Sequence, residues 1–120
     1  DMELHNLTDT ENLNVVAFEK ETMDKLGLIP EIAPRYRATY FSHIIGGYAA
    51  GYYSYLWAEV LDTDAFEAFK EHGVFDKNTA DSFRKNILEK GGTEDPMTLY
   101  RGFRGADPSL EPLLKNRGLK

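Results

Sequence analysis

The sequence predicts an all-α fold, a single compact domain of five to six helices. No run of alternating β-branched residues is long enough to found a β-sheet. Apolar residues recur instead at helical spacing, and capping residues and glycines separate these apolar segments from one another. The chain has 120 residues, of which 42% are hydrophobic, and this is enough for one hydrophobic core. We therefore expect an ordinary globular protein.

The first half of the chain should hold two helices before its glycine-rich segment. Thr8-x-x-Glu11 has the spacing of a capping box, in which a hydroxyl and a carboxylate bond to free amides at a helix start. The helix that follows should end at Gly27. Residues 28–35 contain two prolines and should form an extended connector. A short helix over residues 37–45 should then end at the glycine pair Gly46-Gly47.

The longest element is expected between Gly51 and His72, a stretch without glycine or proline. Asp64-x-x-Glu67 has the spacing of another capping box, so two shorter helices in place of one long helix stay an open alternative. Asp62 and Asp64 are expected to be solvated or capping residues, because exposed acidic residues are common on protein surfaces.

Three further helices are expected in the last third of the chain. Asp76 or Asn78 can begin the first of them, which should end at Gly91-Gly92. Two Asp-Pro pairs then repeat one signal, an N-cap carboxylate followed by proline at the first helical position. The pairs are Asp95-Pro96 and Asp107-Pro108. A short helix should follow each pair.

Charge and composition exclude several kinds of partner and site. A net charge of −6 and a pI near 5.0 argue against a nucleic-acid partner, because affinity for phosphates comes largely from cationic side chains. The longest uncharged stretch, residues 38–58, holds five tyrosines and His43, so we expect no membrane span. Zero cysteines exclude disulfides, thiolate metal sites and a cysteine nucleophile. We expect a soluble, cytoplasmic protein, and a secreted or periplasmic one stays open.

The histidines give no metal site within the chain. His5, His43 and His72 contain no pair at the one-turn spacing that a helical zinc site uses. We therefore predict no metal ligands among these residues.

The most unusual segment is residues 43–57, HIIGGYAAGYYSYLW. Its glycines let the backbone bend sharply and let another chain approach closely. Each tyrosine offers a neutral hydroxyl donor near pH 7, since a phenol has a pKa of about 10. One interpretation is an oxyanion-binding or peptide-binding surface. The other is a glycine turn with tyrosines half-buried in a helical core, their hydroxyls reaching water.

Residues 41–66, FSHIIGGYAAGYYSYLWAEVLDTDAF, closely resemble the glycine- and tyrosine-rich loop near the C-terminus of a family of zinc oligopeptidases. The family includes thimet oligopeptidase, oligopeptidase A and peptidyl-dipeptidases. The resemblance continues upstream through AFEKETMDKLGLIPEIAPRYR, residues 17–37. Downstream it includes the GG-[ST]-E-D, RGFRG-like and GL-ending segments within residues 71–119. It covers nearly the whole chain.

The resemblance implies that residues 1–120 are the C-terminal helical part of the catalytic domain of a larger helical zincin-type peptidase. In that family an H-E-x-x-H helix and a more distant glutamate hold Zn²⁺. This chain contains neither the H-E-x-x-H motif nor a candidate pair of zinc ligands. The chain begins at Asp1 without an initiator methionine, which also indicates a piece of a longer protein. The expected partners are short peptide substrates and the upstream catalytic part of the same polypeptide. The 120 residues alone should be inactive.

The resemblance also implies roles for residues of the substrate loop, 43–55. Tyr55 corresponds to the tyrosine that donates a hydrogen bond to the oxyanion of the tetrahedral intermediate. Tyr48 and His43 correspond to substrate-contacting residues, and Tyr52 is a further substrate-binding candidate. Three glycines would let the loop adjust around different peptides: Gly46, Gly47 and Gly51.

Two questions stay open from the sequence. The parent could remove C-terminal dipeptides or cut within short peptides. From another class, the chain could be a stand-alone helical peptide-binding or scaffold module without catalysis.

Overall fold

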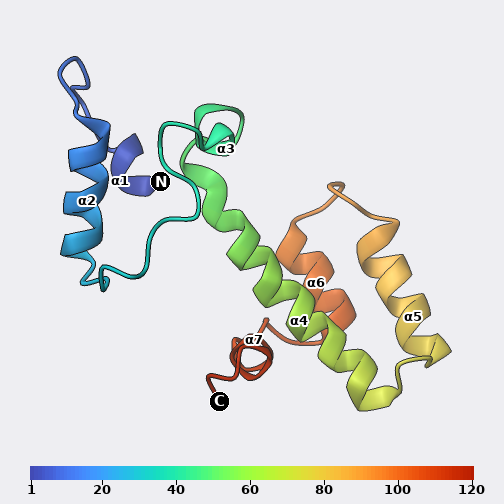
Figure 1. Cartoon of the computed structure of the whole chain (residues 1–120). Coiled ribbons are helices and arrows are strands. Elements are labelled where there is room, and N and C mark those ends of the chain that lie inside the picture. Colours follow the sequence, from blue (N-terminus) through green and yellow to red (C-terminus); the bar gives the residue numbers. More distant parts are fainter. The chain divides into compact units, whose positions relative to one another are not determined.

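The computed structural model describes residues 1–120 and contains only helices, turns and loops (Figure 1). The predicted all-α class is therefore confirmed, with seven α-helices and two short helical segments of other types, η1 and η2. The sequence predicted a single compact domain, whereas the residue contacts cluster in two compact units. Unit 1 is Asp1–Ser54 and unit 2 is Tyr55–Lys120.

Unit 1 begins with α1 (Met2–His5), a single turn, and continues with α2 (Val15–Lys25). The capping box predicted at Thr8-x-x-Glu11 is wrong. Asp9 Oδ1 accepts a hydrogen bond of 3.0 Å from the amide of Glu11, so this stretch forms a turn. Asn14 caps α2 instead, and its Oδ1 accepts a hydrogen bond of 3.1 Å from a backbone amide in the first helical turn.

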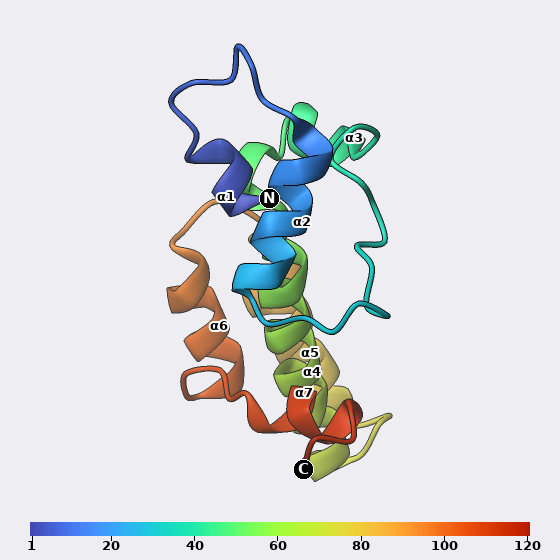
Figure 2. The ribbon, with the colours of Figure 1, turned by 60° about the vertical axis from the view of Figure 1, so that its left-hand side comes forward.

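The end of α2 is as predicted. Gly27 has a φ of +70°, a left-handed conformation that glycine adopts without steric cost. The amide of Leu28 donates to the carbonyl of Met23 over 3.2 Å, which satisfies one of the free carbonyls at the helix end. Residues 28–35 carry no helix, also as predicted, and form the start of the connector between α2 and α3 (Figure 2).

The rest of unit 1 is less helical than predicted. The expected helix over residues 37–45 shrinks to α3 (Ser42–Ile45), which ends at Gly46. A 3₁₀ helix that the sequence did not predict, η1 (Ala49–Tyr53), follows. His5 connects α1 to this region, because its Nε2 lies 3.1 Å from the carbonyl oxygen of Ile44.

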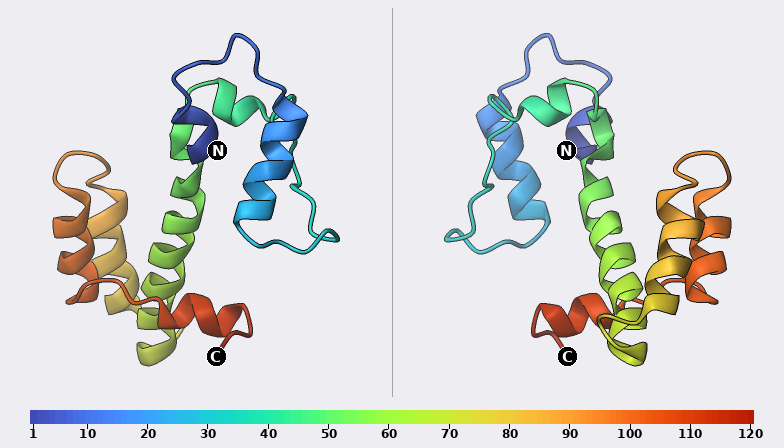
Figure 3. Two further views of the ribbon diagram at one scale, coloured as in Figure 1. Left: turned by 90° about the vertical axis from the view of Figure 1, so that its left-hand side faces the viewer. Right: turned by 90° about the vertical axis from the view of Figure 1, so that its right-hand side faces the viewer.

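Unit 2 is built around α4 (Ser54–His72), which begins at the unit boundary and is unbroken. The alternative of two shorter helices is therefore wrong. Neither α4 nor any other helix combines the length and the apolar character needed to cross a membrane. Three further α-helices follow, and the first of them, α5, continues directly into a π-helical segment, η2. Their bounds are α5 (Lys77–Phe83), η2 (Arg84–Leu88), α6 (Pro96–Arg104) and α7 (Glu111–Asn116). Figure 3 shows the helices of unit 2 in yellow-green to red.

Two of the predicted N-caps are confirmed. Asp76 caps α5 by accepting a hydrogen bond of 2.7 Å from the amide of Thr79. Asp95 caps α6 in the same way through the amide of Thr98, over 2.9 Å, and Pro96 is the first helical residue. These hydrogen bonds favour the ionised carboxylates and lower the pKa of both Asp76 and Asp95.

The third N-cap prediction is wrong, because α7 begins at Glu111 and not after Asp107-Pro108. Asp107 is engaged elsewhere, since its Oδ1 accepts a hydrogen bond of 2.5 Å from Arg101 Nε. This contact lowers the pKa of the Asp107 carboxyl. The first turn of α7 contains Pro112 instead.

Asp64 is the main departure of unit 2 from prediction, because it is buried, with only 3% of its surface exposed. Its Oδ2 accepts a hydrogen bond of 2.6 Å from the hydroxyl of Tyr100 on α6. Arg104 Nε lies 3.5 Å from the same oxygen, and Arg104 also holds Glu71 through two hydrogen bonds of 2.7 and 2.9 Å. Asp62 is exposed, as predicted.

The same network affects proton binding. Burial raises the pKa of Tyr100 well above its ordinary value, and the hydrogen bond to Asp64 adds to this effect. The bidentate contact lowers the pKa of Glu71 and raises the pKa of Arg104. Tyr100 therefore stays a neutral hydroxyl donor to a carboxylate that has almost no access to water.

Aromatic side chains fill the neighbouring part of unit 2. Phe83 and Phe103 meet edge to face with ring centroids 5.1 Å apart, and Phe69 lies 6.0 and 6.2 Å from them. These contacts join α4, α5 and α6.

Replacing Tyr100 by phenylalanine should destabilise unit 2 by about 1–3 kcal/mol, because the buried carboxylate of Asp64 loses its hydroxyl donor. Urea unfolding followed by the fluorescence of Trp57 measures this change, since Trp57 is the only tryptophan and lies in unit 2. Tyr53→Phe removes a hydroxyl from an exposed side chain and is the control, with an expected change below about 0.5 kcal/mol. Equal unfolding free energies for Tyr100→Phe and the unaltered chain would contradict this account.

Candidate functional site

Three of the predicted substrate-binding side chains lie together in unit 1. The ring of His43 lies 5.5 Å from that of Tyr48 and 5.3 Å from that of Tyr52, measured between ring centroids. The two tyrosine rings are 6.5 Å apart. His43 belongs to α3, Tyr48 directly precedes η1, and Tyr52 lies within η1. The turn between these elements therefore brings an imidazole and two phenols to one place.

Phe41 lies at the centre of this group, although the sequence reasoning did not single it out. Its ring meets that of Tyr52 edge to face at 4.6 Å and that of His43 at 5.8 Å. The Phe41 ring also stacks on that of Tyr36, with ring centroids 5.1 Å apart. We call these five residues the aromatic cluster. Phe41 stands two positions before His43, which is the one sequence signal that could have indicated it.

The aromatic cluster is open to solvent and not a closed core. Tyr48 keeps 42% of its surface exposed, and His43, Tyr52 and Phe41 are half-buried. In unit 1 the buried apolar residue is Ile44, next to His43 in α3. The interpretation of this segment as a helical core with a glycine turn therefore does not describe the cluster. The cluster is therefore partly exposed to solvent.

The glycines of the loop have different local roles. A Cβ at Gly46 would lie 3.2 Å from the carbonyl oxygen of Ser42, so this position favours glycine. Gly47 and Gly51 have free space around the position of a Cβ and no positive φ. The left-handed position of the loop falls on Ala49, with a φ of +44°. Such a conformation costs a residue with a Cβ about 1–2 kcal/mol.

Tyr55, the predicted catalytic residue, belongs to unit 2. It lies in the first turn of α4, with 49% of its surface exposed. The structure thus brings His43, Tyr48 and Tyr52 together within unit 1 and places Tyr55 on the helix around which unit 2 is built.

The side chains of this chain do not fit a zinc site. No group of three or more His, Cys, Asp or Glu side chains lies close enough to hold a metal ion. Two of the histidines contact backbone carbonyls: His5 contacts Ile44, and His72 Nδ1 lies 2.9 Å from the carbonyl oxygen of Ala68.

Comparison with known proteins assigns the family. A family model described as peptidase family M3 matches residues 1–119. The chain belongs to peptidase family M3. The family predicted from the resemblance in residues 41–66 and its flanks is therefore confirmed.

Individual M3 proteins match this chain closely. Oligopeptidase A of Haemophilus influenzae is 44% identical over 121 residues, which cover 99% of this chain and 18% of that protein. Oligopeptidase A of Escherichia coli is 57% identical over 81 residues, 67% of this chain and 12% of that protein. Dipeptidyl carboxypeptidase of Escherichia coli is 43% identical over 114 residues, 94% of this chain and 16% of that protein. The chain thus spans less than a fifth of the length of these relatives.

Phe41→Leu should change the surroundings of His43, because an aromatic ring next to the imidazole is lost while an apolar side chain remains. Two-dimensional NMR of the histidine side chains in the 120-residue chain measures this effect as a change in the chemical shifts of the His43 ring protons. His72 lies in unit 2, and its signals serve as the internal control. Unchanged His43 signals would contradict the packing of the aromatic cluster.

Proposed function

We propose that residues 1–120 are the C-terminal helical part of the catalytic domain of a zinc-dependent oligopeptidase or peptidyl-dipeptidase. In this proposal the loop 43–55 binds the peptide substrate and stabilises the oxyanion formed during hydrolysis. Membership of peptidase family M3 supports the reaction class. The observation that carries the assignment of the loop is the partly exposed grouping of His43, Tyr48 and Tyr52 within unit 1.

The proposed role of Tyr55 is electrostatic. Attack on a peptide bond turns the flat carbonyl into a tetrahedral intermediate with a negatively charged oxygen. A hydroxyl donor held at that oxygen stabilises the transition state more than the substrate, and this difference accelerates the reaction. Tyr55 supports the role because it is exposed and sits on a long, unbroken helix, which can hold a donor in a fixed position.

The aromatic cluster is proposed to bind the peptide substrate. Tyrosine hydroxyls and an imidazole can bond to the amides and carbonyls that every peptide carries, and ring faces can contact side chains of different shapes. Such contacts select for a peptide backbone more than for one sequence. The glycines Gly46, Gly47 and Gly51 are proposed to let the loop adjust around different peptides.

The metal and the general base are proposed to lie outside these residues. The resemblance implies a zinc ion, and the side chains of this chain make no site for one. We therefore assign the Zn²⁺, its ligands and the base to the part of the parent polypeptide that this chain does not contain. In this proposal the 120-residue chain lines one side of the active site and is not a complete enzyme.

The kind of cleavage is proposed to depend on residues outside this chain. Proteins named oligopeptidase A and dipeptidyl carboxypeptidase match nearly all of it at almost the same identity, 44% and 43%. The loop and its helices would then serve what the two activities have in common, which is binding of a short peptide and stabilisation of the oxyanion.

Tyr55→Phe in the full-length parent should lower kcat by about a hundredfold to a thousandfold, because one oxyanion donor is lost while the ring remains. Steady-state hydrolysis of a short fluorogenic peptide measures kcat. The matched control is Tyr40→Phe, which removes the hydroxyl of an exposed tyrosine outside the loop 43–55 and should change kcat by less than about threefold.

A kcat for Tyr55→Phe within about threefold of the unaltered parent would rule out the donor role. Metal-dependent hydrolysis by the 120-residue chain alone would rule out a metal site elsewhere in the parent.

A further inference from the structure

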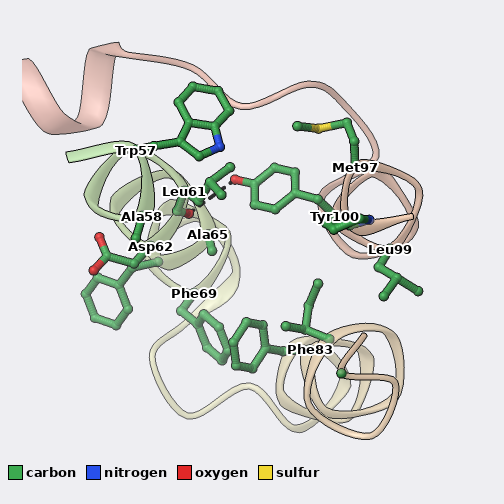
Figure 4. A pocket seen from close by; sticks show the side chains of 14 residues that line it. Trp57, Ala58, Leu61, Asp62, Ala65, Phe69, Phe83, Met97, Leu99 and Tyr100 are labelled. Atoms are coloured by element: carbon green, nitrogen blue, oxygen red, sulfur yellow. Dashed lines mark hydrogen bonds between the residues drawn. The ribbon is translucent and has the colours of Figure 1, made fainter. Parts of the chain in front are cut away.

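Unit 2 contains an apolar groove with a volume of about 500 Å³. It lies between α4, the segment α5–η2 and α6, and Figure 4 shows side chains from these elements turned towards it. The lining residues are Trp57, Ala58, Leu61, Asp62, Ala65, Phe66, Phe69, Phe83, Ile87, Gly91, Pro96, Met97, Leu99 and Tyr100. Asp62 is the one charged residue among them.

The groove leaves large apolar side chains in water. Trp57 and Phe66 each keep 47% of their surface exposed, although both are aromatic and both line the groove. Removing such surface from water is favourable in proportion to its area. An extended, exposed apolar surface of this kind usually marks a binding site.

The shape of the groove favours a helix as its occupant. On α4 the lining residues repeat every four positions, from Trp57 through Leu61 and Ala65 to Phe69. At a rise of about 1.5 Å per residue, this stripe is about 18 Å long. A neighbouring helix with apolar residues at three- and four-residue spacing can insert its side chains along such a stripe.

A polar small molecule fits the groove less well. The one hydroxyl group among the lining residues, that of Tyr100, already donates a hydrogen bond of 2.6 Å to Asp64. It also lies 3.4 Å from the carbonyl oxygen of Leu61, and Figure 4 shows this second contact. Few polar groups are therefore available to orient a small ligand, whereas most small-molecule sites contain several.

We propose that this groove is the docking site for an apolar helix from the part of the M3 polypeptide outside these 120 residues. The occupant is argued from chain length, since the match covers only 18% of Haemophilus influenzae oligopeptidase A and more than four-fifths of that protein lies outside it. The inference rests on the chain being part of a longer M3 polypeptide and is independent of the role of Tyr55. A basic or polar side chain of the helix should face Asp62.

The experiment uses a thiol placed in the groove, because the chain has no cysteine. Ala58→Cys adds one sulfur at a small, exposed lining residue of α4. Lys85→Cys, on the exposed side of η2 and outside the lining, is the control, since an exposed charged residue is expected to stay in water in the parent. The rate of reaction with a thiol reagent is measured for both variants in the 120-residue chain and in the full-length parent.

The expected result is that the thiol of Ala58→Cys reacts at least about tenfold more slowly in the parent than in the 120-residue chain, while the thiol of Lys85→Cys reacts at similar rates in both. Equal rates for Ala58→Cys in the two chains would overturn the proposal. A slow reaction in the 120-residue chain that speeds up on dilution would also overturn it, in favour of a second copy as occupant. Protection in the parent only on addition of peptide substrate would overturn it in favour of a substrate site. None of these readouts requires catalytic activity.

Discussion

The hydrogen bond between Tyr100 and Asp64 is the contact on which the architecture of unit 2 depends. A carboxylate with 3% exposure has lost almost all of its hydration, and such a loss is tolerated only when hydrogen bonds and an opposite charge replace the water. Tyr100 supplies the hydrogen bond, and Arg104 supplies the charge while also holding Glu71. Asp64 and Glu71 belong to α4, and Tyr100 and Arg104 belong to α6, so the network fixes the two helices against each other. It thereby supports both the groove between them and the helix that carries Tyr55.

Local signals in the sequence predicted much of the fold, and the errors came where another contact competed for the same residue. Asp76 and Asp95 cap helices because each has a free amide three residues ahead and no stronger partner. Asp107 has the same local pattern, yet Arg101 takes its carboxylate and the helix begins later. Asp64 could not be predicted as buried, because its partners lie 36 residues and more along the chain. Only the packing of α6 on α4 brings them together.

The candidate site shows a similar division between what sequence and structure contribute. The grouping of His43, Tyr48 and Tyr52 follows from a glycine-rich turn, which the sequence shows directly. The place of Phe41 within the aromatic cluster does not follow from this turn, because it depends on how the chain before α3 folds back. The sequence also gives no sign that Ala49 adopts the left-handed conformation in this loop. Family membership is established, and the roles of the individual residues are proposals.

The central claim is that Tyr55 stabilises the transition state and contributes little to the binding of the substrate itself. The most direct measurement compares two binding affinities in the full-length parent with and without Tyr55→Phe. The first ligand is a phosphinic peptide, whose tetrahedral phosphorus carries charged oxygens like those of the intermediate. The second ligand is an unreactive peptide of the same sequence. We expect Tyr55→Phe to lower the affinity for the phosphinic peptide by about a hundredfold and the affinity for the unreactive peptide by less than about threefold. Equal weakening of both ligands, or no change in either, would contradict it.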